Sequence, residues 1–153
     1  MKITLGEALN LRADLQISIE ELKMRISENI KVQEGDRPSL SPQDLKEELF
    51  NKLDELNELI IRINNTNNQT RLDDKMFLSE ALVLRESLMK KRKLLNTIIE
   101  ESSLKENRYS MSEIRFINTM DIEEIQAEVN EISKSWRILD SRIQQVNWTS
   151  YLI

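Results

Sequence analysis

A segment near the N-terminus returns 73 residues further along the same chain. Residues 5–15 read LGEALNLRADL and residues 78–88 read LSEALVLRESL, so that seven of the eleven positions are identical. Because this offset is close to half of the 153 residues, the repeat favours a fold in which one helical unit is used twice. We predict a single helical domain over residues 1–153, with related halves at about 1–72 and 73–153.

Composition favours long helices and excludes much of enzyme chemistry. The chain has only two glycines and two prolines, and 32% of its residues are charged, which is typical of long helices. It has no cysteine and no histidine. This rules out disulfides, thiol nucleophiles, Ser-His-Asp triads and the usual Cys/His metal sites. We therefore expect a protein that is not an enzyme and uses no metal or cofactor.

Charge and hydropathy indicate which partners and which cellular location to expect. The formal net charge of −5 argues against nucleic acid as a partner. The basic run Lys90–Lys93 is interpreted as a solvated helix face rather than a phosphate site. No apolar run approaches the ~20 residues that span a bilayer, and the N-terminus lacks the layout of a signal peptide. We expect a cytoplasmic protein without a membrane span.

Four segments combine a helix start signal with apolar residues spaced three and four apart. Thr4 and Glu7 form a capping box, Ser41 and Pro42 are a typical N-cap and first helical residue, and Asp121 precedes the last segment. The pattern predicts an all-α fold, a long-helix antiparallel four-helix bundle or coiled coil built from a duplicated αα-hairpin. The apolar stripes include Leu5, Ala8, Leu15, Ile19 and Leu22; Leu45, Leu49, Leu56, Leu59 and Ile63; Leu78, Ala81, Leu88, Leu95 and Ile99; and Ile125, Val129, Ile132, Trp136, Leu139 and Ile143.

The second and fourth segments also match each other, at a shift of 80. Residues 59–63 read LIIRI and residues 139–143 read LDSRI. The two hairpin loops differ more. Residues 113–117 alternate like a short strand, and we expect a short β pairing between the 32–40 and 112–118 loops.

Two arginines occupy seam positions where a charge is costly unless it is paired. These are Arg12 and its repeat partner Arg85. In an up-down bundle, the starts of the first and third helices share an end with the finishes of the second and fourth. The polar residues that we predict to gather there, and which form the candidate ligand site, are Glu7, Arg12, Asn64, Asn67, Thr70, Arg71, Glu80, Arg85 and Asn147.

Three interpretations of this polar cluster remain open. It is a structural network that fixes helix register, an oligomer interface, or a site where two arginines bind a small anion such as a carboxylate or phosphate. A hard cation held by Glu7 and Glu80 is a weaker variant of the third interpretation, and we predict no metal site.

The C-terminal segment 146–153 is unusually apolar for a chain end. Either it folds back over the end of the bundle, or its aromatic residues anchor a neighbouring subunit, since Trp and Tyr dominate interface hot spots. Trp148 and Tyr151 are therefore candidate interface residues.

Segments spread over nearly the whole chain resemble a family of small bacterial helical proteins that often carry the name septicolysin. The resembling segments are LNLRADLQ (9–16), KVQEGDRP (31–38), RINNTNNQTRL (62–72), SEIRFINTMDI (112–122) and SRIQQVNWTSYL (141–152). The resemblance implies a helical fold, and the family name implies a cytolysin. It directs attention to Arg12, the turn 34–36, Asn64, Asn67, Thr70, Arg71, Asn147, Trp148 and Thr149.

Taken together, the residues predict a non-enzymatic helical protein that self-associates into a homo-oligomer. The alternative is a small-molecule or anion-binding protein that uses the Arg/Asn-rich end of the bundle. A third hypothesis, a membrane-active cytolysin-like protein, follows from the resemblance alone.

Overall fold

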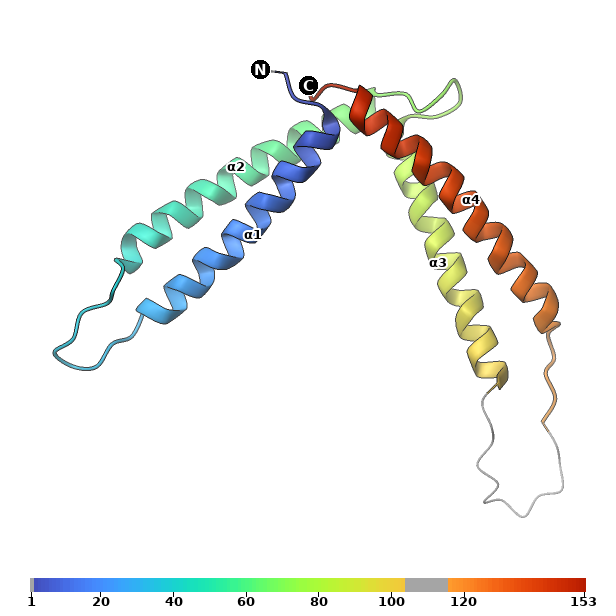
Figure 1. Cartoon of the computed structure of the whole chain (residues 1–153), viewed down its shortest axis with the longest axis horizontal. Coiled ribbons are helices and arrows are strands. Elements are labelled where there is room, and N and C mark those ends of the chain that lie inside the picture. The colour runs from blue at the N-terminus through green and yellow to red at the C-terminus, as the bar shows by residue number, and fades with distance from the viewer. Residues whose placement is uncertain (1, 104–115) are drawn as a thin grey trace, which may run out of the picture. The chain divides into compact units, whose positions relative to one another are not determined.

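The computed structural model describes residues 2–103 and 116–153. These residues form four long helices, α1 (Leu5–Asn29), α2 (Pro42–Gln69), α3 (Leu78–Ser103) and α4 (Ile122–Thr149), which are drawn in Figure 1. The predicted all-α fold of four helices is confirmed. None of the helices in the described part of the chain has a stretch long and apolar enough to cross a lipid bilayer.

The helix starts follow the predicted signals. α1 begins with a complete capping box between Thr4 and Glu7, and Ser41 caps α2 by accepting from the backbone N–H of Asp44. At α4, the Asp121 carboxylate accepts from the backbone N–H groups of Glu123 and Glu124, at 3.0 and 3.1 Å. In each case a side-chain oxygen satisfies N–H groups that have no partner inside the helix.

The chain packs as two compact units, of which the first combines residues 1–78 with residues 144–153. In this unit α1 and α2 pack against each other. The period of three and four residues explains the packing, since it gives each helix one apolar stripe. The buried apolar residues of the first unit are Leu5, Ala8, Leu15, Ile19, Leu22, Leu45, Leu56, Leu59, Ile63, Leu78 and Leu152.

A loop of irregular structure joins α1 to α2. The Asn29 side chain links the two ends of this loop. It accepts a hydrogen bond from the backbone N–H of Leu40 at 3.0 Å and donates one to the carbonyl of Arg25 at 2.8 Å. Gly35 has φ of 94°, a conformation that glycine adopts without strain. Residues 32–40 contain no strand, so the β pairing predicted for this loop is not found, and residues 112–115 lie outside the described part.

The second unit, residues 79–143, contains nearly all of α3 and most of α4, which lie side by side in Figure 1. Several predicted seam residues in this unit are only half-buried rather than buried, among them Leu88, Leu95, Ile99, Ile132 and Trp136. The buried apolar residues found in its described part are Ala81, Ile125, Val129, Leu139 and Ile143.

Candidate functional site

A backbone clasp fixes the two chain ends of the first unit. The N–H of Leu5 donates to the carbonyl of Ser150 at 2.8 Å, and the N–H of Leu152 donates to the carbonyl of Ile3 at 2.9 Å. Leu5 and Leu152 are buried on either side of this short antiparallel pairing. The chain that leaves α4 is thereby held against the start of α1, and the two termini lie together (Figure 1).

The same pair of hydrogen bonds occurs between the end of α2 and the start of α3. The N–H of Leu78 donates to the carbonyl of Thr70 at 2.8 Å, and the N–H of Leu72 donates to the carbonyl of Met76 at 3.0 Å. Leu78 corresponds to Leu5 at the offset of 73, and Thr70 corresponds to Ser150 at the offset of 80. The starts of α1 and α3 correspond in the repeat. Each is hydrogen-bonded to the segment that follows the end of α4 or of α2, and these two helices also correspond.

Thr66 connects the chain end to α2. Its side chain is fully buried, and its Oγ1 donates to the carbonyl of Arg62 at 2.8 Å while accepting from the N–H of Ile153 at 3.0 Å. Arg62 Nε donates to the carbonyl of Ile153 at 3.1 Å. The buried Thr66 hydroxyl and the Arg62 side chain therefore provide hydrogen-bond partners for both the N–H and the carbonyl of Ile153.

The predicted polar residues near the start of α1 have distinct surroundings. Glu7 is engaged in the capping box, where its Oε2 accepts from the Thr4 N–H at 2.6 Å and from the Thr4 hydroxyl at 3.0 Å. These hydrogen bonds, the backbone one foremost, lower the pKa of Glu7. The Nε of Arg12 is buried without a hydrogen-bond partner among the described residues. Asn147 is buried, Asn67 is half-buried and Asn64 is exposed.

Thr70 and Arg71 belong to the second backbone clasp, which joins the end of α2 to the start of α3. The carbonyl of Thr70 accepts one of its hydrogen bonds, and the Arg71 guanidinium lies 4.6 Å from the centre of the Phe77 ring, within the range of a cation–π contact. Arg71 also donates to the carbonyl of Asp74 at 3.3 Å. Arg71 therefore has partners inside the hairpin 70–77.

Glu80 and Arg85 lie in the second unit, where the structure gives Arg85 a specific partner. Its Nη1 is 2.5 Å from Asp140 Oδ1 of α4, and the two side chains are 30% and 24% exposed. Sequence reasoning missed Asp140, although an acidic residue beside the seam residue Leu139 was the available signal. Seven predicted residues belong to the first unit (Glu7, Arg12, Asn64, Asn67, Thr70, Arg71 and Asn147).

The candidate interface residues Trp148 and Tyr151 lie in the C-terminal clasp and remain 53% and 60% exposed. The Trp148 ring packs on Gly6, so closely that a Cβ at residue 6 would stand 2.8 Å from two ring carbons. The absence of a side chain at Gly6 is what admits the ring. The segment therefore folds back on α1 and still offers aromatic surface to solvent.

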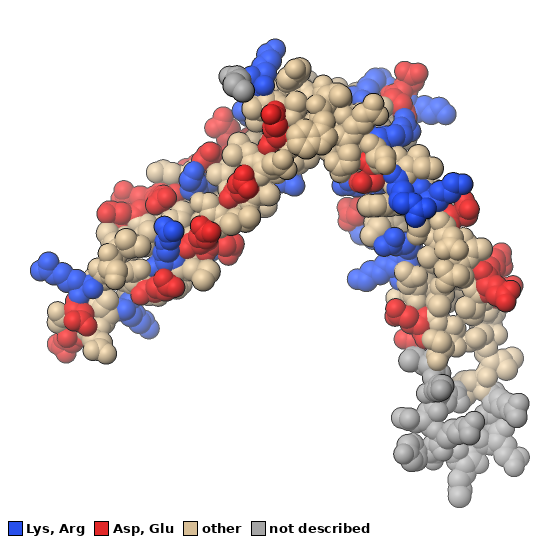
Figure 2. Space-filling view, viewed as in Figure 1, with Lys and Arg blue, Asp and Glu red and all other residues tan. Residues whose placement is uncertain are grey.

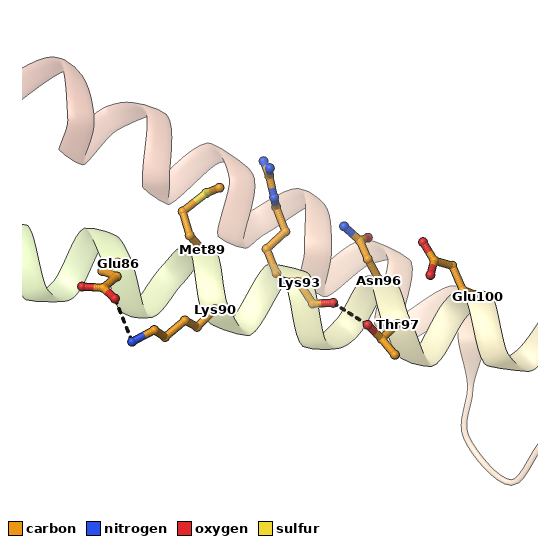
Figure 3. Close-up of a pocket in the computed structure, with 8 residues that line it drawn as sticks. Glu86, Met89, Lys90, Lys93, Asn96, Thr97 and Glu100 are labelled. Atoms are coloured by element: carbon orange, nitrogen blue, oxygen red, sulfur yellow. Dashed lines mark hydrogen bonds and ion pairs between the residues drawn. The ribbon is translucent and has the colours of Figure 1, made fainter. Parts of the chain in front are cut away.

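A shallow cavity of about 540 Å³ lies along α3. Figure 3 shows the ion pair between Glu86 and Lys90, whose atoms are 2.8 Å apart, on this face. This hydrogen bond and the charge of Lys90 lower the pKa of Glu86. The described lining comes from one helix and carries both signs of charge. Basic side chains gather over part of the α3–α4 unit in the view of Figure 2.

No group of three or more carboxylates that could hold a metal ion is found among the described residues. The described contacts of Glu7, Arg71 and Arg85 are capping, stacking and ion-pair contacts within the protein. These residues therefore organise helix ends and helix pairs.

Comparison with known proteins defines the family. Residues 12–152 match the profile of a family of unknown function (DUF6847). The chain belongs to this family. It is also similar, with 37% identity over 100% of both chains and a TM-score of 0.92, to a functionally unknown conserved protein from Corynebacterium diphtheriae whose crystal structure is known. Among curated proteins, none matches the chain.

Proposed function

We propose that this protein is a non-enzymatic, self-associating helical protein, built from a duplicated αα-hairpin. The duplication is supported by the two equivalent backbone clasps, which pair residues at matching offsets of 73 and 80. Self-association is supported most directly by the small number of buried apolar residues in the described part of the second unit.

A two-helix unit buries one stripe of each helix and leaves the adjoining positions open. In the second unit, seam residues such as Leu88, Leu95 and Trp136 are half-buried, and the indole N–H of Trp136 is buried with no hydrogen-bond partner among the described residues. Burying apolar area is worth about 25 cal/mol per Å². Units with so little core are usually completed by oligomerisation or another cross-link. Packing a second helical surface over these half-buried seam residues would therefore stabilise the protein.

Unfolding at several protein concentrations tests this proposal. If folding and association are linked, the melting temperature rises as the concentration is increased, because binding to the native state stabilises it. We expect a rise of several degrees over a hundredfold range of concentration. A melting temperature independent of concentration, together with a monomeric mass, would contradict the proposal.

Arg12 favours a second candidate, an anion-binding function of the first unit. Its buried Nε has no hydrogen-bond partner among the described residues, and arginine is well suited to binding carboxylate or phosphate. Thermal shift with millimolar phosphate, citrate and nucleotides tests this candidate. Stabilisation that Arg12→Gln removes would support it, and no shift in the wild-type protein would count against it.

The resemblance to the septicolysin-like family supports a third candidate, a membrane-active protein. Dye release from lipid vesicles tests this candidate. Our proposal predicts no release at concentrations at which the protein is associated.

A further inference from the structure

The outer side of α2 carries an exposed stripe of four residues. Phe50, Asp54, Asn57 and Ile61 follow one another at steps of four, three and four residues, which places them on one face of the helix. Phe50 and Ile61 are 56% and 59% exposed. Leu56 and Leu59, which belong to the buried stripe, are 8% and 6% exposed, so the outer stripe is a second face of the helix.

α3 carries a stripe of the same length, in which Ser87 is half-buried and the other three residues are exposed. Val83, Ser87, Lys90 and Leu94 follow at the same steps of four, three and four. Val83 and Leu94 are 69% and 62% exposed, although both are large apolar residues. Each stripe extends over twelve residues, and its first and last residues are about 16 Å apart along the helix axis.

The two stripes are complementary when the helices run antiparallel. Phe50 then faces Leu94, and Ile61 faces Val83, so that apolar residues meet at both ends. Between them, Asp54 faces Lys90 with opposite charge, and Asn57 faces Ser87, with which its amide can form a hydrogen bond. The steps of four and three are also those of a and d positions in antiparallel coiled coils.

We propose that these stripes form an interface in which α2 of one copy packs antiparallel against α3 of a second copy. This inference rests on the self-association proposed above and assigns it a surface of α3 that is separate from the half-buried seam of Leu88 and Leu95. Apart from half-buried Ser87, the chain leaves both stripes exposed, and a second copy carries the complement of each. In a two-fold dimer the contact forms twice, α2 on α3 and α3 on α2, and the assembly closes without exposing another copy of either stripe.

The exposed pair of Lys90 with Glu86 does not oppose this contact. Their side chains are 75% and 67% exposed, and such surface ion pairs contribute little to stability. Lys90 can therefore exchange Glu86 for Asp54 of a second copy, or contact both carboxylates.

Disulfide cross-linking between two single-cysteine variants tests the interface directly, because the chain has no cysteine of its own. Phe50→Cys and Leu94→Cys proteins are mixed in equal amounts and oxidised mildly. We expect a covalent dimer that contains one copy of each variant. The matched control replaces Phe50→Cys by Glu48→Cys, an exposed residue on a different face of α2, and should cross-link to Leu94→Cys far less.

The possible results distinguish an error in this interface from an error in the proposed self-association. If the protein associates but the 50/94 pair does not cross-link, the interface is wrong and self-association stands. Cross-linking of Phe50→Cys to Val83→Cys instead would overturn the antiparallel register. A Phe50→Cys/Leu94→Cys double variant could instead form an internal disulfide and no covalent dimer. That result would show that the two stripes pair within one chain, and it would contradict an interface with a second copy.

Charge reversal provides an independent measurement in the protein without cysteines. Asp54→Lys places two like charges in contact and should raise the dimer dissociation constant at least about tenfold, since such juxtaposition is strongly unfavourable. Adding Lys90→Glu to Asp54→Lys should restore most of the affinity. Equal dissociation constants for the wild-type protein and Asp54→Lys would contradict the interface.

Discussion

Gly6 and Trp148 determine how closely the end of α4 approaches the start of α1. A Cβ at residue 6 would stand 2.8 Å from the Trp148 ring, and this geometry reverses the usual effect of replacing a helical glycine. We predict that Gly6→Ala lowers the free energy of unfolding by about 1–3 kcal/mol, as overpacking does elsewhere. Chemical denaturation followed by tryptophan fluorescence measures the change.

The control is the same substitution in a Trp148→Ala background. There the ring is absent, and Gly6→Ala should be neutral or stabilising by less than about 1 kcal/mol, the ordinary preference of a helix for alanine. Equal losses in both backgrounds would show that the ring contact does not limit residue 6.

Glu7 links the capping box of α1 to pH. Hydrogen bonds from Thr4 lower its pKa in the folded state, so the ionised carboxylate favours folding. That contribution is complete above the unfolded pKa of about 4.3 and is lost as the pH falls through the lowered folded value. We predict that Glu7→Gln destabilises the protein at pH 7 and that the difference from wild type disappears in acid. Denaturation at pH 7 and pH 3 measures this, and a difference independent of pH would contradict it.

Individual residues differed in how far the sequence revealed their roles. Glu7 was predictable because its capping partner lies three residues away, and the structure confirms that pairing. Asp140 and Thr66 were not identified as site residues, because their partners are 55 and 87 residues distant. A local pattern specifies neighbours on one helix, whereas these contacts depend on how different elements pack.

At the scale of elements, buried Thr66 holds the C-terminal clasp to α2. Thr66→Val keeps the shape of the side chain but leaves the N–H of Ile153 without its acceptor. We predict a loss of about 1–2 kcal/mol in the free energy of unfolding, the usual cost of an unsatisfied donor. Thr97→Val is a matched control, because the Thr97 hydroxyl makes the same bond to the carbonyl four residues earlier on an exposed helix face. An equal loss in both variants would contradict a role for Thr66 in the clasp.

The ion pair between Arg85 and Asp140 joins α3 to α4. Arg85→Leu leaves Asp140 without this partner and should destabilise the protein by about 1–2 kcal/mol. The double variant Arg85→Leu/Asp140→Leu should recover most of that loss, because partly buried ion pairs often exchange for apolar residues with little net change. Thermal denaturation measures both variants. A double variant less stable than Arg85→Leu would contradict the assignment of the pair.

The helices themselves were largely predictable, and the segments between them less so. Apolar spacing and the signals at Thr4, Ser41 and Asp121 located the helix starts that the structure shows. Residues 32–40 contain no strand, and most of the alternating segment 113–117 that suggested a pairing lies outside the described part. The clasps that do occur are single bridges, too short to leave a periodic pattern.

In the molecule as a whole, the exposed apolar side chains favour association between copies. Long helices with exposed apolar side chains, such as Phe50, Val83 and Leu94, are costly to leave in water. Both the half-covered seam of the second unit and the complementary outer stripes call for a second helical surface. The family match over residues 12–152 and the structural similarity over the whole chain assign no activity.

The most direct test is the absolute mass of the purified protein, measured by light scattering during size exclusion over a range of concentrations. We predict a defined whole multiple of the 18.1 kDa chain mass, with the dimer expected from the paired stripes. A mass of 18.1 kDa at every concentration would contradict self-association and leave anion binding by the first unit as the function to test.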